Sequence, residues 1–138
     1  SDTISEVYEY SVSFTAGNNY SELLSFPHTI YSSDMVLVYR LSGVTQGTDI
    51  WKLEPETYYF NDGTLDFGYD FDFTRYDVNL FMHGNNLGTV SSNFRLNQIF
   101  RVVIVPGYFG KNASKTVNFE DYNAVVKSFK IDESKLKK

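Results

Sequence analysis

Residues 65–73, with the sequence LDFGYDFDF, constrain the fold of this chain more than any other stretch. Apolar and aromatic side chains alternate there with Asp and Gly, which is the period of a β-strand with one buried face. The segment Asn61-Asp62-Gly63 lies just before it, and an Asp-Gly step readily takes the positive φ angles of a tight hairpin turn. We therefore predict a hairpin between residues 58–60 and 65–73.

Strand patterns of this kind continue through most of the chain up to residue 105. The strands that we expect cover residues 4–14, 20–26, 35–41, 50–60, 65–73, 78–82 and 98–105. Pro55 requires a sheet edge or a break within residues 50–60. Residues 42–48 and 83–92 are expected as a polar turn and a loop. Since no helical pattern separates the strands, we predict an antiparallel β-sandwich, or a partly closed barrel, of about seven strands.

The hydrophobic period changes near the end of the chain. There, apolar side chains recur at helical spacing, and they predict one amphipathic helix over about 119–129. Asn118 is the expected N-cap, and Glu120 and Asp121 lie in the first turn, where the helix dipole favours anions. The side chains expected to pack on the sheet are Phe119, Tyr122, Val126 and Phe129.

Composition sets the limits on organisation and partners. A chain of 138 residues predicts a single domain over 1–138, and a net charge of −5 argues against nucleic acid. The basic tail 135–138 is expected to be solvated.

The chain has no Cys and no apolar run of about 18 residues, so we predict neither disulfides nor a transmembrane segment. Because it begins at Ser1, we interpret it as a mature or trimmed fragment.

The inventory of catalytic side chains is poor. His28 and His83 are the only histidines, and the chain has no Gly-x-Ser-x-Gly elbow, no His-Glu-x-x-His motif and no phosphate-binding glycine loop. We therefore predict no catalytic residue, no cofactor and no enzymatic activity. A hydrolase that uses the paired carboxylates of Asp70 and Asp72 is the catalytic alternative.

Aromatic and acidic side chains are the strongest positive signal. The chain has 11 Tyr and 12 Phe but a single Trp. Sugars are commonly held by aromatic faces together with carboxylate and amide groups, which makes the following residues candidates for ligand binding: Trp51, Tyr58, Tyr59, Asp70, Asp72 and Tyr76. The same aromatics also suit core packing and strand faces.

The acidic ladder of Asp66, Asp70 and Asp72 has two interpretations. Successive side chains on one strand face lie about 7 Å apart, so carboxylates there could bind calcium. The candidate metal ligands are Asp62, Asp70, Asp72 and Asp77. The alternative is a solvated face whose charges discourage edge-to-edge pairing. Because a flat strand does not fold ligands around a point, we predict no metal site.

Three segments match glycosylation sites. Asn19-Tyr20-Ser21 and Asn112-Ala113-Ser114 are acceptor sequences for N-glycans at Asn19 and Asn112. Asp2-Thr3-Ile4 is similar to the O-glycosylation site of exported Bacteroidetes proteins, with Thr3 as the acceptor.

Several sequence segments together resemble a family of small uncharacterised exported proteins of Bacteroidetes. They cover most of the chain from Met35 onward and comprise residues 35–41, 51–53, 57–63, 71–73, 77–81, 97–106 and 121–126. The resemblance implies an exported lipoprotein in which a lipid-bearing Cys and a collagen-like segment precede a β-rich head. Neither the lipid-bearing Cys nor the collagen-like segment is present in this sequence, so the resemblance would place both upstream of Ser1. It implies no catalytic residue.

These observations favour a non-catalytic interaction module at the cell surface or outside the cell. A collagen-like stalk would make the head trimeric, because such stalks wind three chains together. A fibre subunit is a variant, in which residues 1–7 add a strand to a neighbouring copy. The expected partners are a protein or further copies of the chain. The alternative is a carbohydrate-binding module that uses exposed aromatics and the face carrying Asp70 and Asp72.

Overall fold

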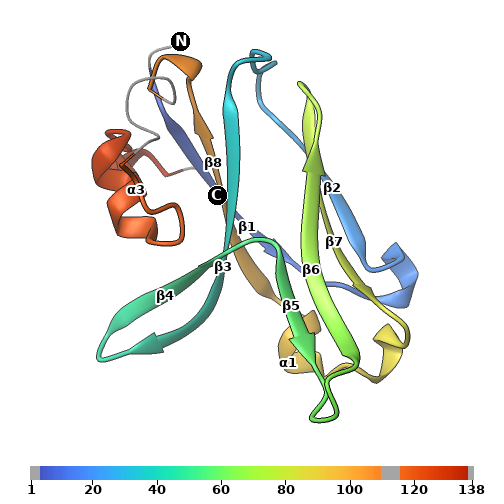
Figure 1. Cartoon of the computed structure of the whole chain (residues 1–138). Coiled ribbons are helices and arrows are strands. Elements are labelled where there is room, and N and C mark those ends of the chain that lie inside the picture. The colour runs from blue at the N-terminus through green and yellow to red at the C-terminus, as the bar shows by residue number, and fades with distance from the viewer. Residues whose placement is uncertain (1–3, 110–115, 137–138) are drawn as a thin grey trace. The chain divides into compact units, whose positions relative to one another are not determined.

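A computed structural model of the chain describes residues 4–109 and 116–136 and contains two four-stranded antiparallel sheets (Figure 1). The strands are β1 (Glu6–Val12), β2 (Ser21–Ser25), β3 (Met35–Thr45), β4 (Thr48–Leu53), β5 (Glu56–Tyr59), β6 (Leu65–Phe73), β7 (Asp77–Gly84) and β8 (Gln98–Val105). Their orders are β1-β8-β3-β4 and β2-β7-β6-β5. This confirms the predicted mainly β class and fits an antiparallel β-sandwich. Both orders end in edge strands, so neither sheet closes into a barrel.

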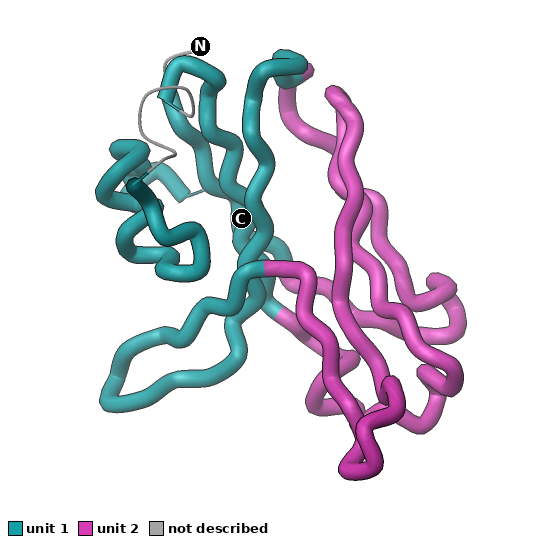
Figure 2. Tube along the Cα trace, viewed as in Figure 1, with its two compact units in different colours: residues 1–10, 30–53, 99–138 teal, residues 11–29, 54–98 magenta. Residues whose placement is uncertain are grey.

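The chain divides into two compact units (Figure 2). Unit 1 comprises residues 1–10, 30–53 and 99–138, and unit 2 comprises residues 11–29 and 54–98. The sheet of β3, β4, β8 and most of β1 belongs to unit 1, whereas the sheet of β2, β5, β6 and β7 belongs to unit 2.

Unit 1 has a core that helix α3 (Tyr122–Ser128) completes. The buried members of this core are Val7, Tyr39, Val103, Val105, Tyr122, Val125, Phe129 and Ile131. Phe119 and Val126 are partly buried against it. The Tyr39 hydroxyl donates a hydrogen bond of 2.7 Å to the Phe119 carbonyl and joins the sheet to the segment before the helix. The predicted packing of the helix on the sheet is therefore confirmed.

The predicted start of this helix is wrong. Its N-cap is Asp121, whose carboxylate accepts the backbone N–H of Ala124, rather than Asn118. Asn118 forms a turn of its own, because its carbonyl accepts the N–H of Asp121 and its side chain accepts that of Glu120. Phe119 consequently packs from outside the helix, with its ring 6.1 Å from the ring of Phe129. Beyond α3 lies the 3-10 turn η3 (Glu133–Lys135), which includes part of the predicted basic tail.

The polar turn predicted at residues 42–48 is also wrong. Strand β3 continues to Thr45 and β4 begins at Thr48, so only Gln46 and Gly47 form the turn. Their φ angles of 50° and 75° are both positive, as a tight two-residue hairpin turn requires. The residues at the end of this β3–β4 hairpin are mostly small and polar, so the sequence did not indicate strands there. The described part of the chain has eight strands where about seven were expected, because the predicted strand 50–60 is divided into β4 and β5.

Unit 2 is built around the predicted hairpin. Strands β5 and β6 pair antiparallel, with Tyr58 opposite Phe67, which confirms the pairing of residues 58–60 with 65–73. The predicted strand 50–60 breaks at Pro55 into β4 and β5. Strand β7 extends to Gly84, beyond the predicted end at residue 82, and the loop that follows contains η2 (Leu87–Thr89) and α1 (Ser92–Arg95). A third short turn, η1 (Ala16–Asn18), precedes β2.

No helix in the described part of the chain combines the length and apolar character that crossing a bilayer demands.

Candidate functional site

The six residues predicted to bind a ligand are divided between the two units. Trp51 lies in unit 1, and the other five lie in unit 2. The Tyr58 ring stacks on Phe67 at 4.8 Å, and its hydroxyl donates to the Glu56 carboxylate at 2.6 Å. Tyr58 therefore serves the packing of unit 2. Tyr59 and Tyr76 are 65% and 61% exposed, but they lie at opposite ends of β6.

Asp70 and Asp72 share the face of β6 opposite to the buried side chains of Phe67 and Tyr69. On β7, Asp70 lies opposite Phe81 and Asp72 lies opposite Asn79. The Asp70 carboxylate also accepts the backbone N–H of Phe71 at 2.8 Å. The cross-strand neighbours of these carboxylates are therefore Phe81 and Asn79, and neither was among the residues predicted to bind a ligand.

The predicted metal-ligand candidates are separated along β6. Asp62 lies in the turn before this strand, and its carboxylate accepts both the hydroxyl and the N–H of Thr64. Those hydrogen bonds lower the pKa of Asp62. Asp77 lies beyond the other end of the strand and accepts the Thr74 hydroxyl. Across residues 4–109 and 116–136, no three His, Cys, Asp or Glu side chains are grouped so that they could hold a metal ion.

Of the three predicted glycosylation sites, only Asn19 lies within the described residues. It is exposed, directly after η1, and its φ of 58° belongs to the left-handed region that Asn tolerates. Thr3 and Asn112 lie outside the described residues.

A cluster around Arg101 of β8 brings together side chains from distant parts of unit 1. The guanidinium carbon lies 4.4 Å from the centroid of the Trp51 ring and 5.4 Å from that of Tyr122. Its nitrogens donate to Glu9 at 3.2 Å and to Glu133 at 2.8 Å. The Arg101 side chain is only 14% exposed. Trp51 therefore belongs to a charged network that ties η3, α3 and β4 to β8.

Tyr122 is the polar centre of this network. Its hydroxyl accepts a hydrogen bond from Arg101 at 2.9 Å and donates one to Glu133 at 3.0 Å. Burial raises the pKa of Tyr122 to about 12, although the Arg101 guanidinium acts in the opposite direction. Sequence reasoning missed Arg101, although a charged residue within the apolar run of residues 99–105 was a usable signal.

We expect the protein to lose stability as the pH rises from about 10 to 12, and we expect Tyr122→Phe to reduce that loss. The native pKa of Tyr122 lies above the ordinary value of 10.0, so its contribution is present below pH 10 and disappears as the hydroxyl ionises. A shift of this size corresponds to roughly 2 to 3 kcal/mol. Urea unfolding at pH 8, 10 and 11.5 measures it. Tyr59→Phe, which changes an exposed ring, is the control, and equal losses in both variants would contradict the assignment.

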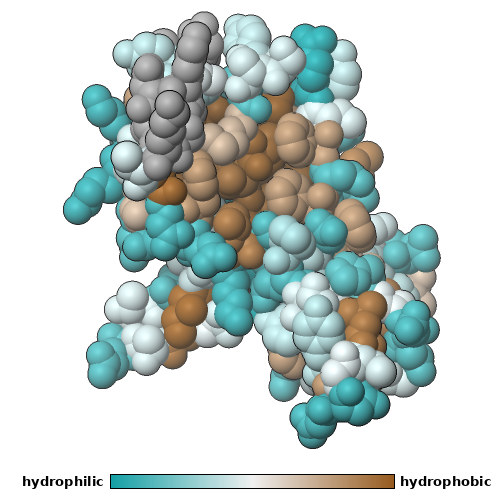
Figure 3. Space-filling view, viewed as in Figure 1, coloured by the Kyte–Doolittle hydropathy of each residue, from teal (hydrophilic) through white to brown (hydrophobic). Residues whose placement is uncertain are grey.

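The β3–β4 hairpin ends in a second feature, which we call the arm and define as residues 44–50. Every residue of the arm is exposed (Figure 3). Val44 lies opposite Asp49, and Gly43 lies opposite Ile50. Since neighbouring cross-strand pairs point to opposite sides, Val44 and Ile50 place one apolar side chain on each face of the arm. They are 61% and 39% exposed.

Strand β4 is also an edge of its sheet, since β3 is its one neighbour in the strand order of the described chain. An edge strand presents backbone N–H and C=O groups to any extended segment that approaches it. The arm therefore combines an open backbone edge with apolar side chains on both faces. The open edge of the arm can pair with another β-strand. The side chains of the arm support binding and no catalytic chemistry.

Comparison of the chain with protein-family models, with curated proteins and with solved structures finds no match.

Proposed function

We propose that this chain is a non-catalytic interaction module that associates with further copies of itself through the edge of β4. One observation carries the proposal: the arm presents Val44 and Ile50 to solvent on opposite faces while β4 is an edge strand. The module would act as an oligomeric head or a fibre subunit. The carbohydrate-binding alternative stays a prediction, and the separation of its candidate residues gives it no support.

The exposure of the arm argues for a partner. A two-stranded ribbon without a covering layer is at best marginally stable in water, and exposed apolar side chains add no stability to it. Natural sheets usually protect an edge with charges, proline or a bulge. The arm carries Asp49 as its one charged side chain, and the register shift of β3 lies between Leu41 and Gly43, before the arm begins.

A second copy suits the edge of β4 for two reasons. An antiparallel pair of identical strands is related by a twofold axis, so one patch binds itself. Strand β4 carries one Asp and one Lys, so pairing two of them does not add like charge, although the whole chain has a net charge of −5. An axis through Ile50 would place Ile50 opposite its own copy and Thr48 opposite Lys52 of the other copy.

A single cysteine tests this pairing without interference, because the chain has none of its own. In an antiparallel pair, opposite Cα atoms are about 4.5 to 5.5 Å apart, within the range that a disulfide spans. We expect Ile50→Cys to form a covalent dimer rapidly under mild oxidation. Val44→Cys is the control, since it is also exposed but lies one strand farther from the proposed axis. Equally slow or equally fast dimer formation by both variants would rule out the pairing.

The cell-surface part of the proposal rests on the sequence resemblance alone. An exported head would be digested by protease added to intact cells that make the protein. Protection of the chain until the cells are lysed would contradict this part and leave the strand pairing unaffected.

A further inference from the structure

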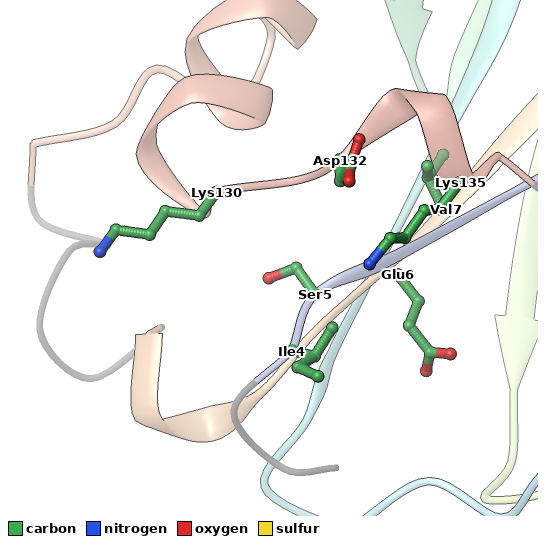
Figure 4. A pocket seen from close by; sticks show the side chains of 7 residues that line it. All are labelled: Ile4, Ser5, Glu6, Val7, Lys130, Asp132 and Lys135. Atoms are coloured by element: carbon green, nitrogen blue, oxygen red, sulfur yellow. The ribbon is translucent and has the colours of Figure 1, made fainter.

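Unit 1 contains a pocket of about 270 Å³ between the start of β1 and the segment that follows α3 (Figure 4). Its lining includes Ile4, Ser5, Val7, Lys130, Asp132 and Lys135. Glu6 completes the lining. At about 30 Å³ for each molecule, the pocket has the volume of roughly nine waters. Neither the arm nor the Arg101 cluster contributes a side chain to it.

Ser5 is the unusual member of this lining. The residue is 7% exposed, and its hydroxyl makes no hydrogen bond with any described part of the chain. Buried hydroxyls nearly always have a partner, because an unsatisfied one keeps its full desolvation cost. In Figure 4 the hydroxyl points into the space between β1 and residues 130–135. It is therefore a buried hydrogen-bonding group without a partner in the described part of the chain.

Lys135 supplies a positive charge to the same space. Its ammonium group extends from η3 toward the side of the pocket where Ser5 lies (Figure 4). Lys130 lines the opposite rim with its aliphatic stem and directs its ammonium group outward. A group that enters between Ser5 and Lys135 would thus meet one hydroxyl and one cation.

The two carboxylates of the lining are occupied elsewhere. Asp132 accepts the N–H and the hydroxyl of Ser134, which together lower the pKa of its carboxyl group. Glu6 accepts the Tyr8 hydroxyl at 2.7 Å, and its side chain points away from Ser5 in Figure 4. Both groups keep their negative charge, and Lys135, which also helps to lower the pKa of Asp132, is the cation that faces Ser5 (Figure 4).

Ile4 and Val7 line the pocket with apolar atoms. From these groups together, we propose that the pocket binds a small monocarboxylate with a short alkyl chain. The carboxylate would accept hydrogen bonds from Ser5 and Lys135, and the alkyl chain would pack against Ile4 and Val7. An acid with about six to eight non-hydrogen atoms fits the available volume. A free acid and the carboxyl terminus of a peptide share this chemistry.

Titration of the whole protein with hexanoate, followed by ¹H–¹⁵N NMR, tests the site. We expect saturable chemical-shift changes at Ser5 and Lys135. Hexanamide, the uncharged amide of the same chain length, should bind about tenfold more weakly. Acetylglycine, which carries the carboxylate of a peptide terminus and matches hexanoate in size, separates the two sources: tighter binding than hexanoate identifies a peptide end, and weaker binding identifies a free acid. Hexanoate shifts that do not saturate, or equal binding of hexanamide, would overturn the proposal.

Two variants distinguish binding from a structural role. Lys135→Gln should weaken hexanoate about tenfold, whereas Lys127→Gln, an exposed lysine of α3 outside the pocket, should not change it. Ser5→Ala should raise the melting temperature of the free protein by about 3 °C, because it removes an unsatisfied hydroxyl, and yet weaken hexanoate. If Ser5→Ala lowers the melting temperature, or if both lysine variants bind hexanoate equally well, the site is not the one proposed.

Discussion

Phe129→Ala is expected to destabilise the protein by about 3 to 5 kcal/mol, the usual cost of removing a large aromatic side chain from a core. Phe129 is 0% exposed and belongs to the core of unit 1, where its ring stacks on Phe119 at 6.1 Å. It follows α3 directly, so the cavity would open where the helix meets the sheet. Domains are commonly stable by only about 5 to 15 kcal/mol, so the loss would be a large fraction of the total.

Urea unfolding monitored by circular dichroism measures this loss. The matched control is Phe60→Ala, because Phe60 is 53% exposed and the same atoms are removed from the surface. We expect the control to change stability by less than about 1 kcal/mol. Equal effects of the two substitutions would show that α3 does not complete the core of unit 1 as described.

Gly68→Ala is expected to cost about 1 to 3 kcal/mol or more, because it overpacks the middle of a sheet. A Cβ atom at Gly68 would lie 2.5 Å from the backbone oxygen of Glu56 and 2.4 Å from Nε2 of His83. His83 lies directly opposite Gly68 on β7, so its imidazole covers the space that a side chain would need. The backbone of β5 cannot move aside without disturbing its pairing with β6.

Two further variants separate these contacts. Gly43→Ala is the matched control, because Gly43 also lies in a strand but a Cβ there meets nothing within 4 Å. His83→Ala combined with Gly68→Ala should recover only the part of the loss that the imidazole causes, since the Glu56 oxygen remains. A Gly68→Ala protein as stable as Gly43→Ala would contradict the close approach of β5 to β6.

Local patterns in the sequence were enough to predict the secondary structure in outline. The alternation in residues 65–73 and the Asp-Gly turn before it predicted the β5–β6 hairpin correctly. The arm was missed because residues 45–48, Thr-Gln-Gly-Thr, resemble a turn in composition, and only the pairing of β3 with β4 places Thr45 and Thr48 in strands. The helix start was missed because Asn118 and Asp121 both have the chemistry of an N-cap.

The candidate sites were harder to predict for a different reason. The Arg101 cluster and the pocket both join the N-terminal strand to residues beyond 120, and each contains residues that are more than 90 positions apart in the sequence. No spacing rule links Glu9 to Arg101, or Ser5 to Lys135. Exposed aromatics could be listed from the sequence, but strand pairing determines which of them meet, and it separates Tyr59 from Tyr76.

The absolute mass of the protein in solution, measured by light scattering over a range of concentrations, tests self-association through β4 most directly. The comparison is with Ile50→Asp, which would place two carboxylates at the centre of the proposed pair, where like charges directly opposite are destabilising. We predict a mass that rises with concentration to a dimer or a larger assembly, and a monomer for Ile50→Asp at every concentration. A native protein that stays monomeric, or an assembly that Ile50→Asp leaves intact, would contradict the account.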